Sequence, residues 1–191
     1  MKTRLYMLIF ATAVCWLLTA CGSKGNAGLQ AKVDSLEAEL KQYRAEKALT
    51  AQRLQRFDTL DFDFYSGQQW DSLAISHDAN IKVYYPDGSV TTGLFPQHID
   101  MLKPMFVFAP DTKIKTHPVR FGEGDWTAVI GEMAGTFTQP MPIGGGKTIP
   151  PTGKPFKLSM VTIGHWKDGK MIEEYLFWDN QSFMKQIGLA K

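Results

Sequence analysis

Glu174 is the residue of this chain whose type and surroundings best suit acid–base chemistry. A strand is expected over residues 170–178, and its alternation places Ile172, Glu174, Leu176 and Trp178 on one face. A carboxyl group among apolar side chains has a raised pKa and can serve as a general acid or base. The alternative is that Glu174 lies near the rim of a cavity, where it is hydrated or paired with a lysine.

The neighbours of Glu174 follow from the turn before its strand. Asp168-Gly169 is a strong hairpin signal, and a two-residue turn there pairs Val161 with Leu176 and Ile163 with Glu174. A second predicted strand contributes an aromatic hydroxyl group. The residues that we expect to bind a ligand are Tyr84, Val161, Ile163, Leu176 and Trp178.

Metal and phosphate sites have little support in the sequence. The four histidines, His77, His98, His117 and His165, include no pair at spacing two or four that would suit a metal on one element. Residues 144–148 read Gly-Gly-Gly-Lys-Thr, but a phosphate-binding loop needs a glycine where this chain has Met141. We therefore expect no metal and no cofactor, and a mobile loop over residues 140–153.

The charge balance argues against nucleic acid as a partner. Lys2 and Arg4 are the only charged residues among the first 20, so the rest of the chain has 19 basic and 19 acidic residues. A body without net charge lacks the basic surface that binding to a phosphate backbone requires. No nucleic-acid partner is expected.

The first 20 residues have the features of a secretory signal peptide. Two positive charges precede the apolar stretch 5–20, which is shorter than the roughly 20 apolar residues of a membrane span. The stretch ends in Leu18-Thr19-Ala20-Cys21, which resembles the lipobox of bacterial lipoproteins. That resemblance implies cleavage before Cys21, a lipid on its sulfur and, because Gly22 follows, a place at the outer membrane facing the periplasm. The alternative is a chance cysteine in an ordinary signal peptide.

A tether and a helical stalk are expected after the cysteine. Residues 21–28 have the glycine-rich composition of a flexible linker. Residues 29–50 carry apolar side chains at the 4, 3, 4, 3 spacing of a coiled coil, namely Leu29, Val33, Leu36, Leu40 and Tyr43. This spacing predicts either a short self-associating stalk, which would make a homodimer, or a spacer helix that packs on its own domain.

Residues 51–191 are expected to form one α+β domain. Helical spacing dominates its beginning, and strand patterns with turn signals follow almost to the end. Helices followed by a run of strands favour a segregated α+β fold. We expect a strongly bent antiparallel sheet that wraps around the amino-terminal helices as a cone, with a cavity between them.

Several short phrases of this domain match those of a known family. They are Gly124-Asp125-Trp126-Thr127-Ala128-Val129, Gly135-Thr136-Phe137, Pro150-Pro151-Thr152-Gly153-Lys154, Lys167 to Glu174, Trp178-Asp179 and Gln186-Ile187-Gly188. With these phrases in this order along the sequence, the chain resembles the SnoaL-like polyketide cyclase, or ester cyclase, family of the nuclear transport factor two-like superfamily. The resemblance implies a cone with a cavity. It also places Leu176 where the cyclases have an acid–base aspartate, and leucine cannot move a proton.

Three functions remain open from the sequence. The first is a membrane-anchored module that binds a small, largely apolar molecule in its cavity. The second is an enzyme of the ester cyclase, isomerase or hydrolase kind that uses Glu174. The third is a structural lipoprotein in which the domain mediates dimerisation. An occupied, dry pocket with one buried carboxylate would favour the second, and a pocket filled by side chains would favour the third. An open apolar pocket with no titrating group would favour the first.

Overall fold

The computed structural model describes the backbone of residues 2–191 and the side chains of residues 26–191. The chain divides into two compact units, residues 1–47 and residues 48–191. The second unit contains every strand of the described chain. Its amino-terminal limit is Ala48.

The first unit is helical throughout its described backbone. Helix α1 (Lys2–Asp58) continues through residues 21–28, which differs from the flexible tether expected there. The segment has no proline, so nothing in it forces the backbone out of helical geometry. The apolar side chains of the stalk are exposed, Leu29 at 63% and Leu36 at 55%, so self-association of the stalk stays a prediction.

The signal peptide and the lipid anchor also stay predictions. The side chain of Cys21 lies outside the described residues. Within the described part of the chain, no helix combines the length and the apolar character needed to cross a membrane.

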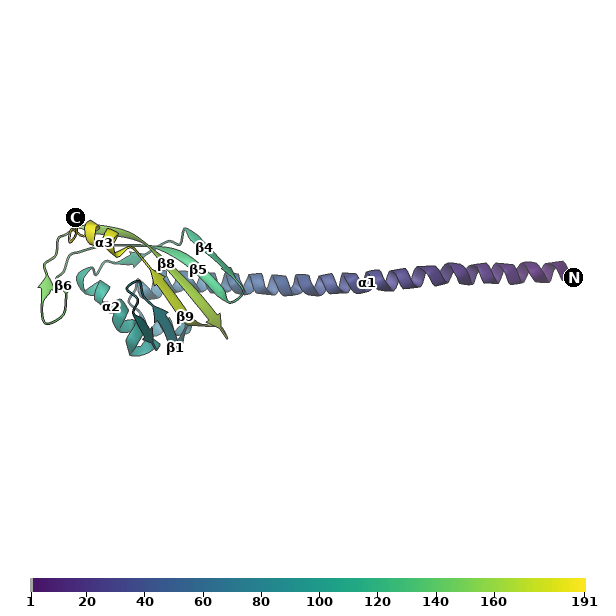
Figure 1. Ribbon diagram of the computed structural model, residues 1–191, viewed down its shortest axis with the longest axis horizontal. Helices are drawn as coiled ribbons and strands as arrows, with labels where there is room; N and C mark the ends of the chain where they lie inside the picture. Colours follow the sequence, from purple (N-terminus) through teal and green to yellow (C-terminus); the bar gives the residue numbers. More distant parts are fainter. Residues whose placement is uncertain (1) are drawn as a thin grey trace. The chain divides into compact units, whose positions relative to one another are not determined.

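The second unit has the α+β order expected from the sequence (Figure 1). After α1 come η1 (Thr59–Tyr65), η2 (Trp70–Ile75), β1 (His77–Tyr84), β2 (Val90–Thr92), η3 (Leu94–His98) and α2 (Ile99–Phe108). The remaining elements are β3 (Lys113–Ile114), β4 (Val119–Glu123), β5 (Trp126–Thr136), β6 (Met141–Pro142), β7 (Thr148–Ile149), β8 (Pro155–Lys167), β9 (Lys170–Phe177) and α3 (Asn180–Gln186). Helices therefore dominate the beginning of this unit and strands its remainder.

The main sheet is mixed, which corrects the antiparallel sheet expected from the sequence. Its strands lie in the order β2-β1-β9-β8-β5-β3, and β4 also pairs with β5. All pairs are antiparallel except β1 with β9, which is parallel. Local turns fix the direction of hairpin partners, but β1 and β9 are separated by most of the domain. No turn signal could reveal their direction.

A β-bulge in the hairpin of β8 and β9 decides which side chains face inward. Lys167 pairs with Lys170 across the turn, but the register shifts between His165 and Trp166. One extra residue on β9 therefore reverses the alternation beyond the bulge. Met171 and Glu174, three positions apart, are both buried as a result.

The core lies between the inner face of the sheet and the helices. One buried cluster centres on Phe57 and Trp166, whose rings meet edge to face at 5.7 Å. A second cluster, nearer α3, contains Phe137, Phe156 and Phe183. The two clusters hold the sheet against the helical segments while leaving room between them for a cavity.

Candidate functional site

A cavity of about 310 Å³ opens in the second unit between the helical segments and the inner face of the sheet. Most of its lining is apolar or aromatic, including Leu73, Phe108, Met133, Leu158, Met160 and Leu176. The carboxylates and imidazoles that reach it are Asp61, His77, Asp87, His98 and Glu174. A largely apolar cavity with a few polar groups is the usual form of a small-molecule site.

Three of these polar groups form a compact buried cluster. His77 begins β1, His98 ends η3 and Glu174 lies in β9. The Glu174 Oε2 atom is 3.4 Å from Nε2 of His98 and 3.7 Å from Nε2 of His77. All three side chains are at least nine-tenths buried, and Glu174 Oε2 has no hydrogen-bond partner among the side chains and backbone that the structure describes.

The far nitrogen of each imidazole is fixed by a hydrogen bond. Nδ1 of His77 donates to the Leu73 carbonyl oxygen at 3.0 Å. Nδ1 of His98 lies 2.8 Å from the Tyr85 hydroxyl, which is also 3.2 Å from Oγ1 of Thr91. These contacts orient both rings so that Nε2 faces Glu174.

The cluster shifts the protonation of its members. Burial raises the pKa of Glu174, the contacts with His77 and His98 lower it, and the balance leaves the pKa below its usual value. This corrects the raised pKa expected from the sequence, which assumed apolar neighbours only. Burial lowers the pKa of His98 to about 4, so its ring is neutral at pH 7.

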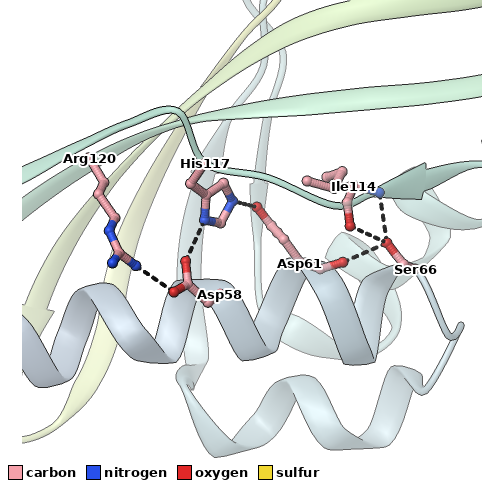
Figure 2. Close-up of polar contacts among 6 residues, drawn as sticks. All are labelled: Asp58, Asp61, Ser66, Ile114, His117 and Arg120. Atoms are coloured by element: carbon pink, nitrogen blue, oxygen red, sulfur yellow. Dashed lines mark hydrogen bonds and ion pairs between the residues drawn. The ribbon is translucent and has the colours of Figure 1, made fainter.

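A second network, of hydrogen bonds and ion pairs, reaches the cavity lining at Asp61 (Figure 2). His117 lies between two carboxylates, with Nδ1 2.8 Å from Asp58 Oδ1 and Nε2 2.8 Å from Asp61 Oδ2. Arg120 donates to the other oxygen of Asp58. Burial lowers the pKa of His117, but the hydrogen bonds and charges of the two aspartates outweigh it and leave the pKa raised. Burial raises the pKa of Asp61, against the opposing effect of His117.

The structure places some of the expected site residues in the cavity wall and others outside it. Glu174, Leu176 and Trp178 line the cavity, whereas Val161 and Ile163 do not. The expected register is wrong by one residue, because Thr162 pairs with Leu176 and Gly164 with Glu174. The extra residue in β9 places Glu174 and Leu176 opposite Gly164 and Thr162, so Thr162 lies on the inner face and its neighbours Val161 and Ile163 lie on the other.

Tyr84 is also outside the cavity lining. Its ring stacks on Tyr175 at 4.3 Å, and Tyr85, the next residue, lines the cavity instead. Asp179, which follows the cavity residue Trp178, accepts a hydrogen bond from the backbone N–H of Ser182 and so caps α3.

Sequence reasoning missed His77, His98 and Asp61 as cavity residues. His98 lies 21 positions after His77 and 76 positions before Glu174. No local spacing therefore joins the histidines to each other or to Glu174. A weak signal existed in their positions, since His77 begins a strand and His98 precedes an apolar helix. Only the packing of β1 and η3 around β9 brings them together.

Comparisons with known proteins agree with this fold. The family model described as SnoaL-like polyketide cyclase matches residues 55–187. A candidate SnoaL-like polyketide cyclase from Jannaschia sp. CCS1 is 21% identical, with a TM-score of 0.63, covering 75% of this chain and 96% of that one. IdmH, a candidate polyketide cyclase from Streptomyces antibioticus, is 20% identical, with a TM-score of 0.61, covering 72% and 99%.

A third solved structure extends the fold comparison. It is a hypothetical protein from Catenulispora acidiphila with a ketosteroid isomerase-like fold, in complex with trimethylamine. It is 15% identical, with a TM-score of 0.55, covering 74% of this chain and 95% of that one. A search of the curated proteins finds no match.

Proposed function

This chain belongs to the SnoaL-like polyketide cyclase family, and we propose that its cavity binds a small, largely apolar molecule with one polar group. The observation that carries this is the cavity itself, which combines an apolar lining with the buried cluster of Glu174, His77 and His98. Apolar walls favour binding by removing apolar surface from water. The polar group of the ligand, such as a carbonyl or hydroxyl, would be placed at the cluster.

Binding can be tested with the apolar dye Nile red and two substitutions in β9. Leu176 lines the cavity and is buried, whereas the adjacent Phe177 is outside the lining and 49% exposed. Leu176→Trp should fill the cavity and weaken dye binding, and Phe177→Trp should leave it unchanged. Because a larger side chain can strain a packed core, Met101→Glu gives a second test at a cavity residue that is 45% exposed. Equal binding by all three variants would contradict the proposal.

Proton transfer by Glu174 is the second candidate function. It is favoured by one observation: a buried carboxylate oxygen without a hydrogen-bond donor lies on the cavity wall. Such an oxygen could take a proton from a bound molecule, for example from a carbon next to a carbonyl group. Mass spectrometry of molecules that copurify with the chain would identify a compound to test. Turnover of that compound should be lost in Glu174→Gln and kept in Glu173→Gln.

We further propose that the domain is held at a membrane by a lipid on Cys21. The lipobox-like sequence Leu18-Thr19-Ala20-Cys21 and the preceding charged and apolar segments support this. An envelope location would suit a chain whose only cysteines are Cys15 and Cys21, because no thiol would then remain for unwanted disulfides. A homodimer formed through the stalk is compatible with this arrangement.

A further inference from the structure

We propose that His77, His98 and Glu174 form a binding site for a divalent first-row transition-metal ion of the zinc or iron type. The inference deepens the proposed function, because an ion there would face the same cavity as the ligand. It does not depend on the identity of that ligand, since metal binding is measured with the ion alone.

The donor set is the first argument. Two imidazole nitrogens and one carboxylate oxygen come together, with the ligand atoms of all three residues within 4.8 Å of one another. Two histidines and one carboxylate bind zinc in metalloproteases and iron(II) in many oxygenases. Such sites use three protein ligands and leave a coordination position open, here toward the cavity.

The distances are the second argument. The contacts of 3.4 and 3.7 Å from Glu174 Oε2 to the two Nε2 atoms exceed the range of about 2.7–3.2 Å for a hydrogen bond. Two ligands bound at about 2.0–2.1 Å to one tetrahedral ion lie about 3.3–3.4 Å apart. The carboxylate oxygen is therefore spaced from each imidazole as for a shared ion, and the ligand atoms of all three residues lie within 4.8 Å of one another, close enough to converge on one.

The hydrogen bonds behind the imidazoles are the third argument. A carbonyl oxygen can only accept, so Nδ1 of His77 carries a proton and donates it to Leu73. In the neutral ring the lone pair then lies on Nε2, beside Glu174. Ligand histidines usually donate their other ring N–H to a carbonyl, carboxylate or water in this way. The Tyr85 hydroxyl can accept from Nδ1 of His98 while it donates to Thr91.

The unpartnered oxygen of Glu174 is the fourth argument. Glu174 Oε2 is buried and receives no hydrogen bond from the described part of the chain, which is costly for a carboxylate. A cation between the three groups would satisfy the carboxylate and both nitrogens together.

The test uses the full-length chain, stripped with a chelator and titrated with Zn²⁺ and, separately, Co²⁺. We expect one ion per chain and a visible Co²⁺ spectrum typical of low coordination number, with no comparable binding of Mg²⁺. Loss of an outer-shell partner alone costs about 10- to 100-fold in metal affinity. Glu174→Gln and His98→Gln, which remove direct ligands, should therefore weaken binding about 100-fold or more.

The matched control is the pair His165 and Glu173. They occupy the same hairpin, contact each other at 2.9 Å and are partly exposed. His165→Gln and Glu173→Gln should keep the affinity of the parent chain. Equal weakening by the control variants, or no weakening by the cluster variants, would overturn the proposal.

X-ray absorption of the zinc-loaded parent chain gives a readout that needs no variant to fold. We expect imidazole scattering and nitrogen or oxygen ligands at about 2.0–2.2 Å. A coordination shell without imidazole would overturn the proposal. If zinc fails to bind while Leu176→Trp still abolishes Nile red binding, the metal site is wrong and the ligand-binding proposal stands. If zinc binds but Leu176→Trp leaves Nile red binding unchanged, the ligand-binding proposal is wrong and the metal site stands.

Discussion

Replacing His117 with glutamine should show how much the network behind the cavity stabilises the fold. His117 is almost completely buried and bonds two carboxylates at 2.8 Å. A hydrogen bond to a charged group contributes about 1.5–3 kcal/mol. Asp58 keeps Arg120 as a partner, so the loss of its bond to His117 should cost an amount near the lower limit of this range. Asp61 loses His117, its partner in this network, so the loss of that bond should cost more. We expect His117→Gln to lower the free energy of unfolding by about 3–4 kcal/mol at about pH 6.

The pH dependence of this loss follows from the raised pKa of His117. A raised folded pKa means that the contribution is complete below the unfolded value of about 6.5 and is lost as the pH rises through the folded value. The physical reason is that a neutral imidazole can donate to only one of the two aspartates. The difference between parent and His117→Gln should therefore shrink as the pH rises above about 6.5 and through the raised folded pKa of His117.

Urea unfolding of both chains at several pH values measures this difference. The control is His165→Gln, because His165 pairs with Glu173 in a partly exposed contact that should contribute no more than about 1 kcal/mol. A loss in His117→Gln no larger than in the control would refute the argument from burial. A large loss that does not vary with pH would refute the charged imidazole and place the shared proton on Asp61.

Three further predictions concern packing, the anchor and the stalk. Gly164→Ala should destabilise the fold by about 1–3 kcal/mol in urea, because its Cβ would lie 2.5 Å from Met171 Sδ and 3.1 Å from Phe57 Cζ; Gly28→Ala, which meets no atom within 4 Å, is the control. Cys21→Ser should release the chain from membranes or leave the precursor uncleaved on cell fractionation, and processing and membrane binding like those of the parent would exclude lipidation. A chain that begins at Ala51 should still melt cooperatively, since the compact second unit begins at Ala48; loss of cooperative melting would show that the stalk belongs to the core.

The sequence was sufficient for the fold class because its signals are local. Alternation along residues 156–167 and 170–178, and the turn at Asp168-Gly169, predict the hairpin that forms β8 and β9. The bulge in that hairpin has no comparable signal, because an extra residue such as Ile172 differs little in type from one that is paired. Because the register of the two strands shifts by one residue, Thr162 lines the cavity in place of the expected Val161 and Ile163.

The candidate site was predictable only in the part that β9 supplies. Glu174, Leu176 and Trp178 line the cavity because they follow one another on a single element. His77 and His98 come from elements whose positions depend on the parallel pairing of β1 with β9 and on the packing of η3 against β1. Long-range pairing of this kind leaves no pattern in the neighbouring residues, so the imidazoles beside Glu174 could not be foreseen, nor could their effect on its pKa.

The two adjacent glutamates of β9 show how the bulge divides the chemistry of the hairpin. Glu173 and Glu174 lie on opposite faces of the sheet, and each meets histidine. Glu173 contacts His165 at 2.9 Å where water can reach both, so the pair is an ordinary surface contact that salt and solvent weaken. Glu174 meets His77 and His98 in an apolar enclosure, at distances too long for hydrogen bonds. Because Glu174 meets two imidazoles and Glu173 only one, a difference in metal binding between the two positions measures the effect of the second imidazole together with that of the enclosure.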